Sequence, residues 1–203
     1  MSFQELLHIA AVSGGILYVI VFILLVGLTI IVDRTWYLAK IVRQGELIAG
    51  TVLEMEDVDR DALMDLAVRT AKYPQGAVLE VALKYPDVKD PVRLADLIEE
   101  TILLQAPRID RSLWLLDTIV TLGPLLGLLG TIVGIFEAFK VLGAADTAPT
   151  KVTGGVAEAL IATAAGLFVA ILGLVFFNGL NNRVRLIMHQ MEAIKVMLVN
   201  RLT

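Results

Sequence analysis

The sequence predicts an all-α integral membrane protein with three transmembrane helices, long helices that extend into the cytoplasm and a helical cytoplasmic domain. Hydrophobic residues make up 57% of the 203 residues and charged residues only 19%, whereas a soluble domain is about 45–50% apolar and about 25% charged. The apolar residues gather in three runs that are each long enough to cross a bilayer. Outside these runs apolar positions recur at helical spacing, and no alternating pattern indicates a strand.

The first apolar run, residues 14–32, contains 19 residues and no charge. About 20 such residues cross a hydrocarbon layer of about 30 Å. Trp36 and Tyr37 follow the run and suit the membrane interface. A cleaved signal peptide is the alternative, but it would need Lys or Arg ahead of the run, and residues 1–13 contain neither. We therefore expect a retained transmembrane helix over 14–32 after a short periplasmic segment.

The second run, residues 118–136, is bracketed by Asp117 and Glu137, and we place a transmembrane helix over 113–137. Pro124 lies inside it and would cost a soluble helix about 3 kcal/mol. Membrane helices tolerate such a proline where neighbouring groups satisfy the freed carbonyl. The two bracketing acids are expected to meet headgroups or water.

The third run, residues 152–182, contains 31 residues and one charged residue, Glu158. A helix of that length measures about 46 Å, which exceeds a bilayer core, so one end should project beyond the membrane. We place a transmembrane helix over 154–178, a periplasmic loop over 138–153 and a cytoplasmic C-terminal helix over 179–203.

Basic residues near the ends of the runs predict the orientation. The N-terminal segment has none, and the connection between the second and third runs has only Lys140 and Lys151. The other flanks carry more of them: Arg34, Lys40, Arg43, Arg108, Arg111, Arg183, Arg185, Lys195 and Arg201. The positive-inside rule therefore puts the N-terminus in the periplasm and the region 33–112 and the C-terminus in the cytoplasm.

The cytoplasmic region is expected to consist of helices, with breaks at Tyr73–Pro74 and Tyr85–Pro86–Asp87. After the third run, apolar residues fall on one helical stripe: Val184, Ile187, Met188, Met191, Ile194, Leu198 and Leu202. We interpret these stripes as helices that pack against each other rather than as a separate binding site.

Several classes of function are excluded by composition. The net charge of −4 argues against nucleic-acid binding. The chain has no cysteine, and its two histidines, His8 and His189, are far apart in sequence, so no metal site is expected. No nucleophile–base pair or phosphate-binding loop is present either, because Gly154–Gly155 alone is no nucleotide fingerprint. The sequence therefore predicts a protein that is not an enzyme and uses no cofactor.

Small residues recur in the second and third runs at spacings that let helix backbones approach closely in lipid. The second run contains Gly123-x-x-x-Gly127 and Gly130-x-x-x-Gly134, and the third is rich in Ala and Gly. This pattern fits tight packing within one subunit. Because three helices offer few partners within one chain, it also favours a homo-oligomer.

Glu158 and two threonines are the candidate functional residues. A charge at mid-membrane costs about 2.5–3.5 kcal/mol, so such a residue normally faces protein or water and serves function. Counted back from the third run's polar end, however, Glu158 falls at the outer edge, where it could be an ordinary helix-start acid. Thr131 and Thr163 could relay a proton, or their hydroxyls could simply bond their own helix carbonyls four residues back.

Two segments resemble the signature spans of the MotA/TolQ/ExbB proton channel family: LGPLLGLLGTIVGIFEAF (122–139) and GGVAEALIATAAGLFVAILGLVFFN (154–178). The positions of Thr131, Glu158 and Thr163 match the family pattern residue by residue. The order of spans and the large cytoplasmic insertion also resemble the family, and the ExbB and TolQ branch in particular, because the flagellar stator branch has four spans.

This resemblance implies a multi-pass protein of the cell inner membrane that forms a homopentamer. The ring would enclose spans from two copies of a partner, ExbD or TolR, and protons crossing that interface would drive TonB or TolA. Thr131, Glu158 and Thr163 would then line the proton pathway. An ExbB-like energiser of TonB-dependent transport is the favoured interpretation, with a TolQ-like subunit of the Tol-Pal system or a non-conducting membrane scaffold as alternatives. A small-molecule transporter fits less well, because three spans show no inverted symmetry.

One departure from the family concerns the third span. Many relatives have Ala-Ile-Pro where this chain has Ala170-Ile171-Leu172, so a proline that bends the helix is missing. The shape of the inner half of this span is therefore open.

Overall fold

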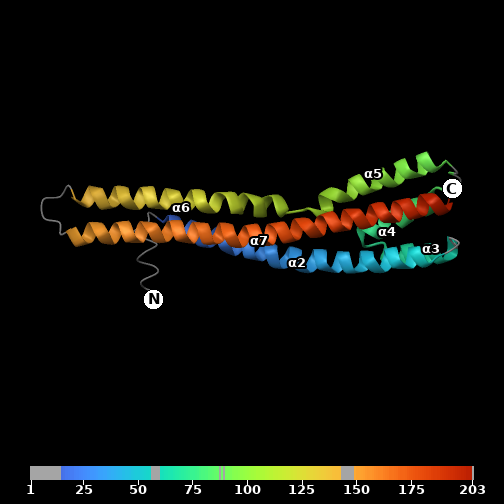
Figure 1. The fold of residues 1–203 in the computed structure, drawn as a ribbon, viewed down its shortest axis with the longest axis horizontal. Coiled ribbons are helices and arrows are strands. Elements are labelled where there is room, and N and C mark those ends of the chain that lie inside the picture. The colour runs from blue at the N-terminus through green and yellow to red at the C-terminus, as the bar shows by residue number, and fades with distance from the viewer. Residues whose placement is uncertain (1–14, 56–59, 87, 89, 143–148, 203) are drawn as a thin grey trace. The chain divides into compact units, whose positions relative to one another are not determined.

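The computed structural model describes residues 15–55, 60–86, 88, 90–142 and 149–202, with backbone only at 141–142 and 149–152. Every regular element in these ranges is a helix: α2 (Ile16–Glu54), α3 (Arg60–Thr70), α4 (Pro74–Lys84), α5 (Pro91–Ile109), α6 (Leu113–Leu142) and α7 (Pro149–Leu202) (Figure 1). The all-α prediction is confirmed. By length and composition α2, α6 and α7 can each cross a membrane.

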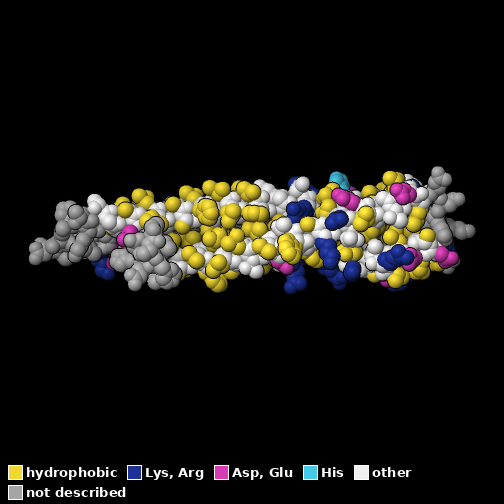
Figure 2. All heavy atoms as spheres, turned by 90° about the horizontal axis from the view of Figure 1, so that it is seen from below, with side chains coloured by type: hydrophobic (Ala, Val, Ile, Leu, Met, Phe, Trp, Pro, Cys, Tyr) yellow, Lys and Arg dark blue, Asp and Glu magenta, His cyan; other side chains and the backbone are white. Residues whose placement is uncertain are grey.

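The chain divides into two compact units. Unit 1 combines residues 1–32 with 112–178, and unit 2 combines residues 33–111 with 179–203. Helices α2 and α7 each contribute their first part to unit 1 and their second part to unit 2. Figure 2 shows hydrophobic side chains over the visible described surface of unit 1 and most of the charged side chains on unit 2.

The helices are longer than the apolar runs that predicted them. Helix α6 continues to Leu142 and α7 already begins at Pro149, so described residues of the expected loop 138–153 are helical. The expected N-terminal segment 1–13 and residues 143–148 lie outside the described residues. Helix α7 runs through Ala170-Ile171-Leu172 without a break for 54 residues, which answers the question of shape that the missing proline left open.

Unit 2 is packed around large aliphatic side chains. The fully buried ones come from all of its helices and include Leu38, Ile48, Leu63, Leu79, Ile98 and Ile194. The helix breaks predicted at Tyr73–Pro74 and Tyr85–Pro86 are confirmed, because α4 begins at Pro74 and ends at Lys84. Helix α5 begins with Asp90 as its cap, whose carboxylate accepts a hydrogen bond from Val92 N at 3.0 Å.

Polar side chains connect the helices of unit 2. Gln75 of α4 donates to Gln190 Oε1 of α7 at 2.9 Å and to Ile41 O of α2 at 3.4 Å, and Gln190 donates to Val42 O at 3.1 Å. The Arg201 guanidinium donates to carbonyls in the last turn of α2 and just beyond it, including Met55 O at 2.7 Å, where a cation is favoured by the helix dipole. Lys195 pairs with Glu99 of α5 at 2.5 Å.

Candidate functional site

Helices α6 and α7 approach each other so closely that their contact is made by small residues. A Cβ placed on Gly134 would lie 2.6 Å from Ala159 Cβ, and one on Gly130 would lie 2.7 Å from Ala162 Cβ. Gly166 is tighter still, because a Cβ there would lie 2.3 Å from the carbonyl oxygen of Gly123. The glycines at these positions therefore permit backbone-to-backbone packing that no larger residue allows.

Both Gly-x-x-x-Gly pairs of α6 are used within one chain. Gly123 and Gly127 face Gly166 and Thr163, while Gly130 and Gly134 face Ala162 and Ala159. Of the two sequence interpretations, packing within the subunit accounts for these glycines directly. They consequently give no separate support to a homo-oligomer.

This close contact brings Thr131 and Thr163 together at hydrogen-bond distance. Thr163 Oγ1 donates to the carbonyl oxygen of Gly127 at 2.9 Å. Thr131 Oγ1 donates to the same oxygen at 3.2 Å, which is the bond within its own helix, four residues back. Two hydroxyls and one backbone carbonyl thus form a small polar cluster between two apolar helices. Hydroxyl groups can both donate and accept, so such a cluster can pass a proton or hold a water.

Other threonines of unit 1 behave differently. Thr29 Oγ1 donates to Leu25 O at 2.8 Å, Thr118 Oγ1 to Trp114 O at 2.8 Å and Thr121 Oγ1 to Asp117 O at 2.9 Å. Each of these bonds stays within one helix and spans four residues, which is the ordinary behaviour of threonine in a membrane helix. Thr131 and Thr163 are distinguished by the bond that joins two helices.

The packing register locates Glu158 along the helix axis. Gly155 faces Ala138, and Ala159 faces Gly134. A step of four residues forward along α7 therefore corresponds to a step of four residues back along α6. Glu158 is therefore level with residues 134–138 of α6, where the second apolar run ends at Phe136. The threonine cluster lies deeper, because Thr163 follows Glu158 by five residues or about 7.5 Å.

Glu158 is partly buried and stands on a different flank of α7 from Thr163. Five residues correspond to a rotation of about 140° around the helix. Val169, which follows Glu158 at helical spacing, is buried in a cluster with Ile20 of α2 and Ile119 of α6, and Ala165 packs against that cluster. The structure thus brings Thr131 and Thr163 together and places Glu158 on the flank that faces α2.

The sequence pattern does not predict the Gly127 carbonyl as part of the site. Residue patterns report side chains, and a backbone oxygen has no signature in them. The available signal was Thr131 at four residues after Gly127, but that spacing alone predicts only a bond within α6.

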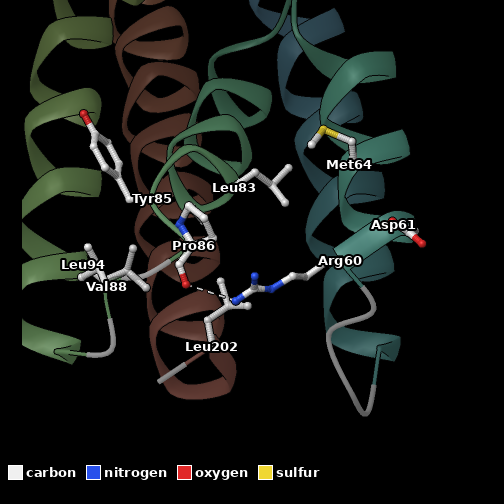
Figure 3. A pocket seen from close by; sticks show the side chains of 10 residues that line it. Arg60, Asp61, Met64, Leu83, Tyr85, Pro86, Val88, Leu94 and Leu202 are labelled. Carbon is white, nitrogen blue, oxygen red and sulfur yellow. Dashed lines mark hydrogen bonds between the residues drawn. The ribbon is translucent and has the colours of Figure 1, made fainter.

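A cavity in unit 2 offers no competing site of recognisable chemistry. It measures about 210 Å³ and is lined by residues of α3, α4, the α4–α5 connection, α5 and the end of α7. Figure 3 shows Arg60 reaching across it toward Pro86, whose carbonyl oxygen accepts a hydrogen bond at 3.2 Å. Among the residues that the structure describes, no group of three His, Cys, Asp or Glu side chains could hold a metal ion.

Comparison with known proteins agrees with these spans. A sequence model of the MotA/TolQ/ExbB proton channel family matches residues 70–193. The biopolymer transport protein ExbB-like 1 of Synechocystis sp. is 32% identical over 172 residues, which cover 82% of this chain and 66% of that protein. An ExbB homolog of Methanothermobacter thermautotrophicus is 29% identical over 189 residues, 91% of this chain and 66% of its own length.

A shorter match comes from the second branch of the family. The Tol-Pal system protein TolQ of Haemophilus influenzae is 47% identical over 73 residues, which are 36% of this chain and 32% of that protein. The chain spans just under two thirds of the length of the Synechocystis and Methanothermobacter relatives. The family match covers most of the chain, including α6 and the first four-fifths of α7. The chain therefore belongs to the MotA/TolQ/ExbB proton channel family.

Proposed function

We propose that this chain is an ExbB-like subunit that conducts protons and uses the proton motive force, with an ExbD-like partner, to energise TonB-dependent transport across the outer membrane. The observation that carries the proposal is the cluster of Thr131, Thr163 and the Gly127 carbonyl between α6 and α7. The cluster supplies polar groups between two apolar helices, and a proton route needs polar groups in its wall.

Glu158 would serve at the mouth of this route, on the α2-facing flank of α7, and protons would cross to the other side of the α6–α7 pair at the threonine cluster between the two helices. Its level at the end of the second apolar run lets the carboxylate exchange protons with water and with a carboxyl group of the partner. The threonine cluster, about 7.5 Å deeper, would then support the protons or the waters that carry them. Each charge that moves through 100 mV releases about 2.3 kcal/mol, which is the source of the mechanical work.

We place the protein in the cell inner membrane with its N-terminus in the periplasm and its C-terminus in the cytoplasm. The basic flanks of the spans support this orientation. The apolar surface of unit 1 supports contact with lipid and with further copies or partners, and Leu125, Phe136 and Phe168 are all largely exposed in the single chain. A pentameric ring around a dimer of the single-span partner is the assembly that the family resemblance implies.

A TolQ-like role in the Tol-Pal system is the second candidate. It is supported by the 47% identity to the Haemophilus protein over 73 residues. The ExbB-like assignment is preferred because the ExbB-like relatives match over 82% and 91% of the chain. Co-purification with either a TonB-like or a TolA-like protein distinguishes the two.

Proton flux into liposomes tests the proposed function. The chain is reconstituted with its ExbD-like partner, and flux is followed with an internal pH dye under an imposed gradient. We expect Glu158→Gln to lower the flux about 100-fold, the lower end of what a positioned proton-transfer group contributes. Glu137→Gln is the matched control, because Glu137 lies near the same level and pairs with Lys140 at 3.6 Å.

Two results would contradict the proposal. Wild-type liposomes without proton flux would favour the non-conducting scaffold, in which Glu158 is a helix-start acid. Equal flux in Glu158→Gln and wild type would remove the carboxylate from the route while leaving the family assignment intact.

A further inference from the structure

A polar stripe runs along the flank of α6 that carries Thr131. Asp117, Pro124 and Thr131 follow one another at seven-residue intervals, and each interval rotates the position by only about 20° around the helix. The contacts of α6 with α2 lie elsewhere, at Leu116, Ile119 and Gly130, which are about 60–120° away from Thr131. The stripe therefore occupies the side of the α6–α7 pair that α2 leaves uncovered.

Asp117 lies at the opposite boundary of unit 1 from Glu158. The α6–α7 register, in which Gly173 faces Val120, makes Asp117 level with Phe176, next to the polar end of the third run at Asn178. Its side chain is exposed, and no basic side chain in the described part of the chain forms an ion pair with it. An acid at this place is therefore available to exchange protons with water.

The stripe between Asp117 and Thr131 contains further polar groups. Pro124 has no N–H, so the carbonyl of Val120, four residues earlier, loses its helical hydrogen bond. Thr121 stands beside it, with its hydroxyl on the Asp117 carbonyl at 2.9 Å. The Gly127 carbonyl and the two clustered threonines continue the series. From Asp117 to Thr131 these groups extend over about 21 Å of helix.

We propose that Asp117 is a second proton-exchanging carboxylate, which takes protons that have passed the threonine cluster and releases them at the boundary opposite Glu158. This inference rests on the proposed function, since it adds the other end of the same route. Asp117 accepts a proton from a water on the stripe side, becomes a neutral carboxylic acid and gives the proton to a water on the bulk side. Only O–H bonds form and break, and the carboxylate is regenerated.

A purely structural role for Asp117 makes a different prediction. If Asp117 serves only the stability of α6, removing its charge would lower the unfolding midpoint of the protein without changing the flux. Flux and stability must therefore be measured on the same samples.

The test uses the complex with its ExbD-like partner in liposomes, and compares wild type with Asp117→Asn and Asp117→Glu. We expect Asp117→Asn to lower the proton flux about tenfold. This is less than the ~100-fold typical of a positioned proton-transfer group, because bulk water can partly replace an acid at the end of the route. The glutamate should restore most of the flux. Asp110→Asn is the control, since Asp110 is an exposed acid that caps the end of α5, before α6 begins.

Size-exclusion chromatography shows whether each variant assembles with the partner. If Asp117→Asn does not assemble, Asp117→Ser is used in its place. Wild-type flux in an assembled variant that lacks the carboxyl group would overturn the inference about Asp117, while a loss of flux in Glu158→Gln would leave the proposed function standing. A wild-type complex that conducts nothing would overturn both.

Discussion

Unit 1 and unit 2 are both all-helical, but different interactions hold them together. In unit 1 the α6–α7 contact is made largely by Gly and Ala, and two threonine hydroxyls form a polar cluster with a carbonyl between the two helices. In unit 2 the buried residues are mostly Leu, Ile and Val, and long polar side chains bridge the helices. The same chain thus uses backbone proximity in one region and side-chain volume in the other.

The difference follows from the solvent that each region is built for. In a membrane, apolar side chains gain little free energy by exchanging lipid contacts for protein contacts. Helices there associate through close van der Waals contact and a few hydrogen bonds. In water, burying a large aliphatic side chain contributes about 1.5–3 kcal/mol. A residue that adds volume should therefore be most harmful in unit 1, and loss of volume or of a buried polar bond should be most harmful in unit 2.

The largest effect is expected from Gly166→Ala in α7. The new Cβ would lie 2.3 Å from Gly123 O and 3.0 Å from Gly127 Cα. Because both are backbone atoms, the helices must separate, which costs about 1–3 kcal/mol or more. Thermal unfolding in detergent should show a lower midpoint. Gly154→Ala is the control in the same helix, because nothing lies within 4 Å of its added Cβ; an equal loss in both variants would refute the backbone-contact argument.

A pair of glycines in α2 tests the polar bonds of unit 2. A Cβ on Gly45 would lie 2.0 Å from Gln190 Oε1 and 2.4 Å from Gln75 Nε2, so Gly45→Ala must displace two buried amides. We expect a loss of about 1–3 kcal/mol, since displaced buried polar groups lose their partners. Gly50 has nothing within 4 Å of its added Cβ, so Gly50→Ala should stabilise the helix by about 0.5–1 kcal/mol.

Unfolding curves of these two variants in one detergent show whether each substitution raises or lowers the free energy of unfolding. Opposite signs would support the assignment of Gly45 to the amide cluster. Stabilisation by both substitutions would show that Gln75 and Gln190 move aside at no cost.

The sequence predicted the fold class and the helix breaks because each depends on local composition. Runs of apolar residues and Tyr-Pro pairs act over a few positions. The bond between Gln75 and Gln190 joins residues 115 positions apart, and no periodicity predicts such a partner. Local pattern also identified Gly123, Gly127, Gly130 and Gly134 as contact residues, but a stripe of small residues does not say which helix it meets.

The candidate site was predicted in part for the same reason. The sequence pattern predicts either a proton relay or a bond within one helix for Thr131 and Thr163. Thr131 makes the bond within its own helix as well as the contact with Thr163, and only the second helix reveals that contact. Hydropathy left the depth of Glu158 undecided, because a 31-residue run can be placed in a membrane in several ways. The register of Gly155 against Ala138 and Ala159 against Gly134 supplies the missing reference.

The smallest effect is expected from Thr163→Val, which keeps the shape of the side chain and removes its hydroxyl. The variant loses the bonds to the Gly127 carbonyl and to Thr131, yet hydrogen bonds between membrane helices contribute only about 0.6 kcal/mol on average. Thr29→Val, which removes only a bond within α2, is the control and should change the midpoint even less. If unit 1 depends on backbone proximity, Thr163→Val must cost less than Gly166→Ala in the same assay. A larger loss for the valine would mean that the hydroxyl cluster, rather than close packing, holds α6 and α7 together.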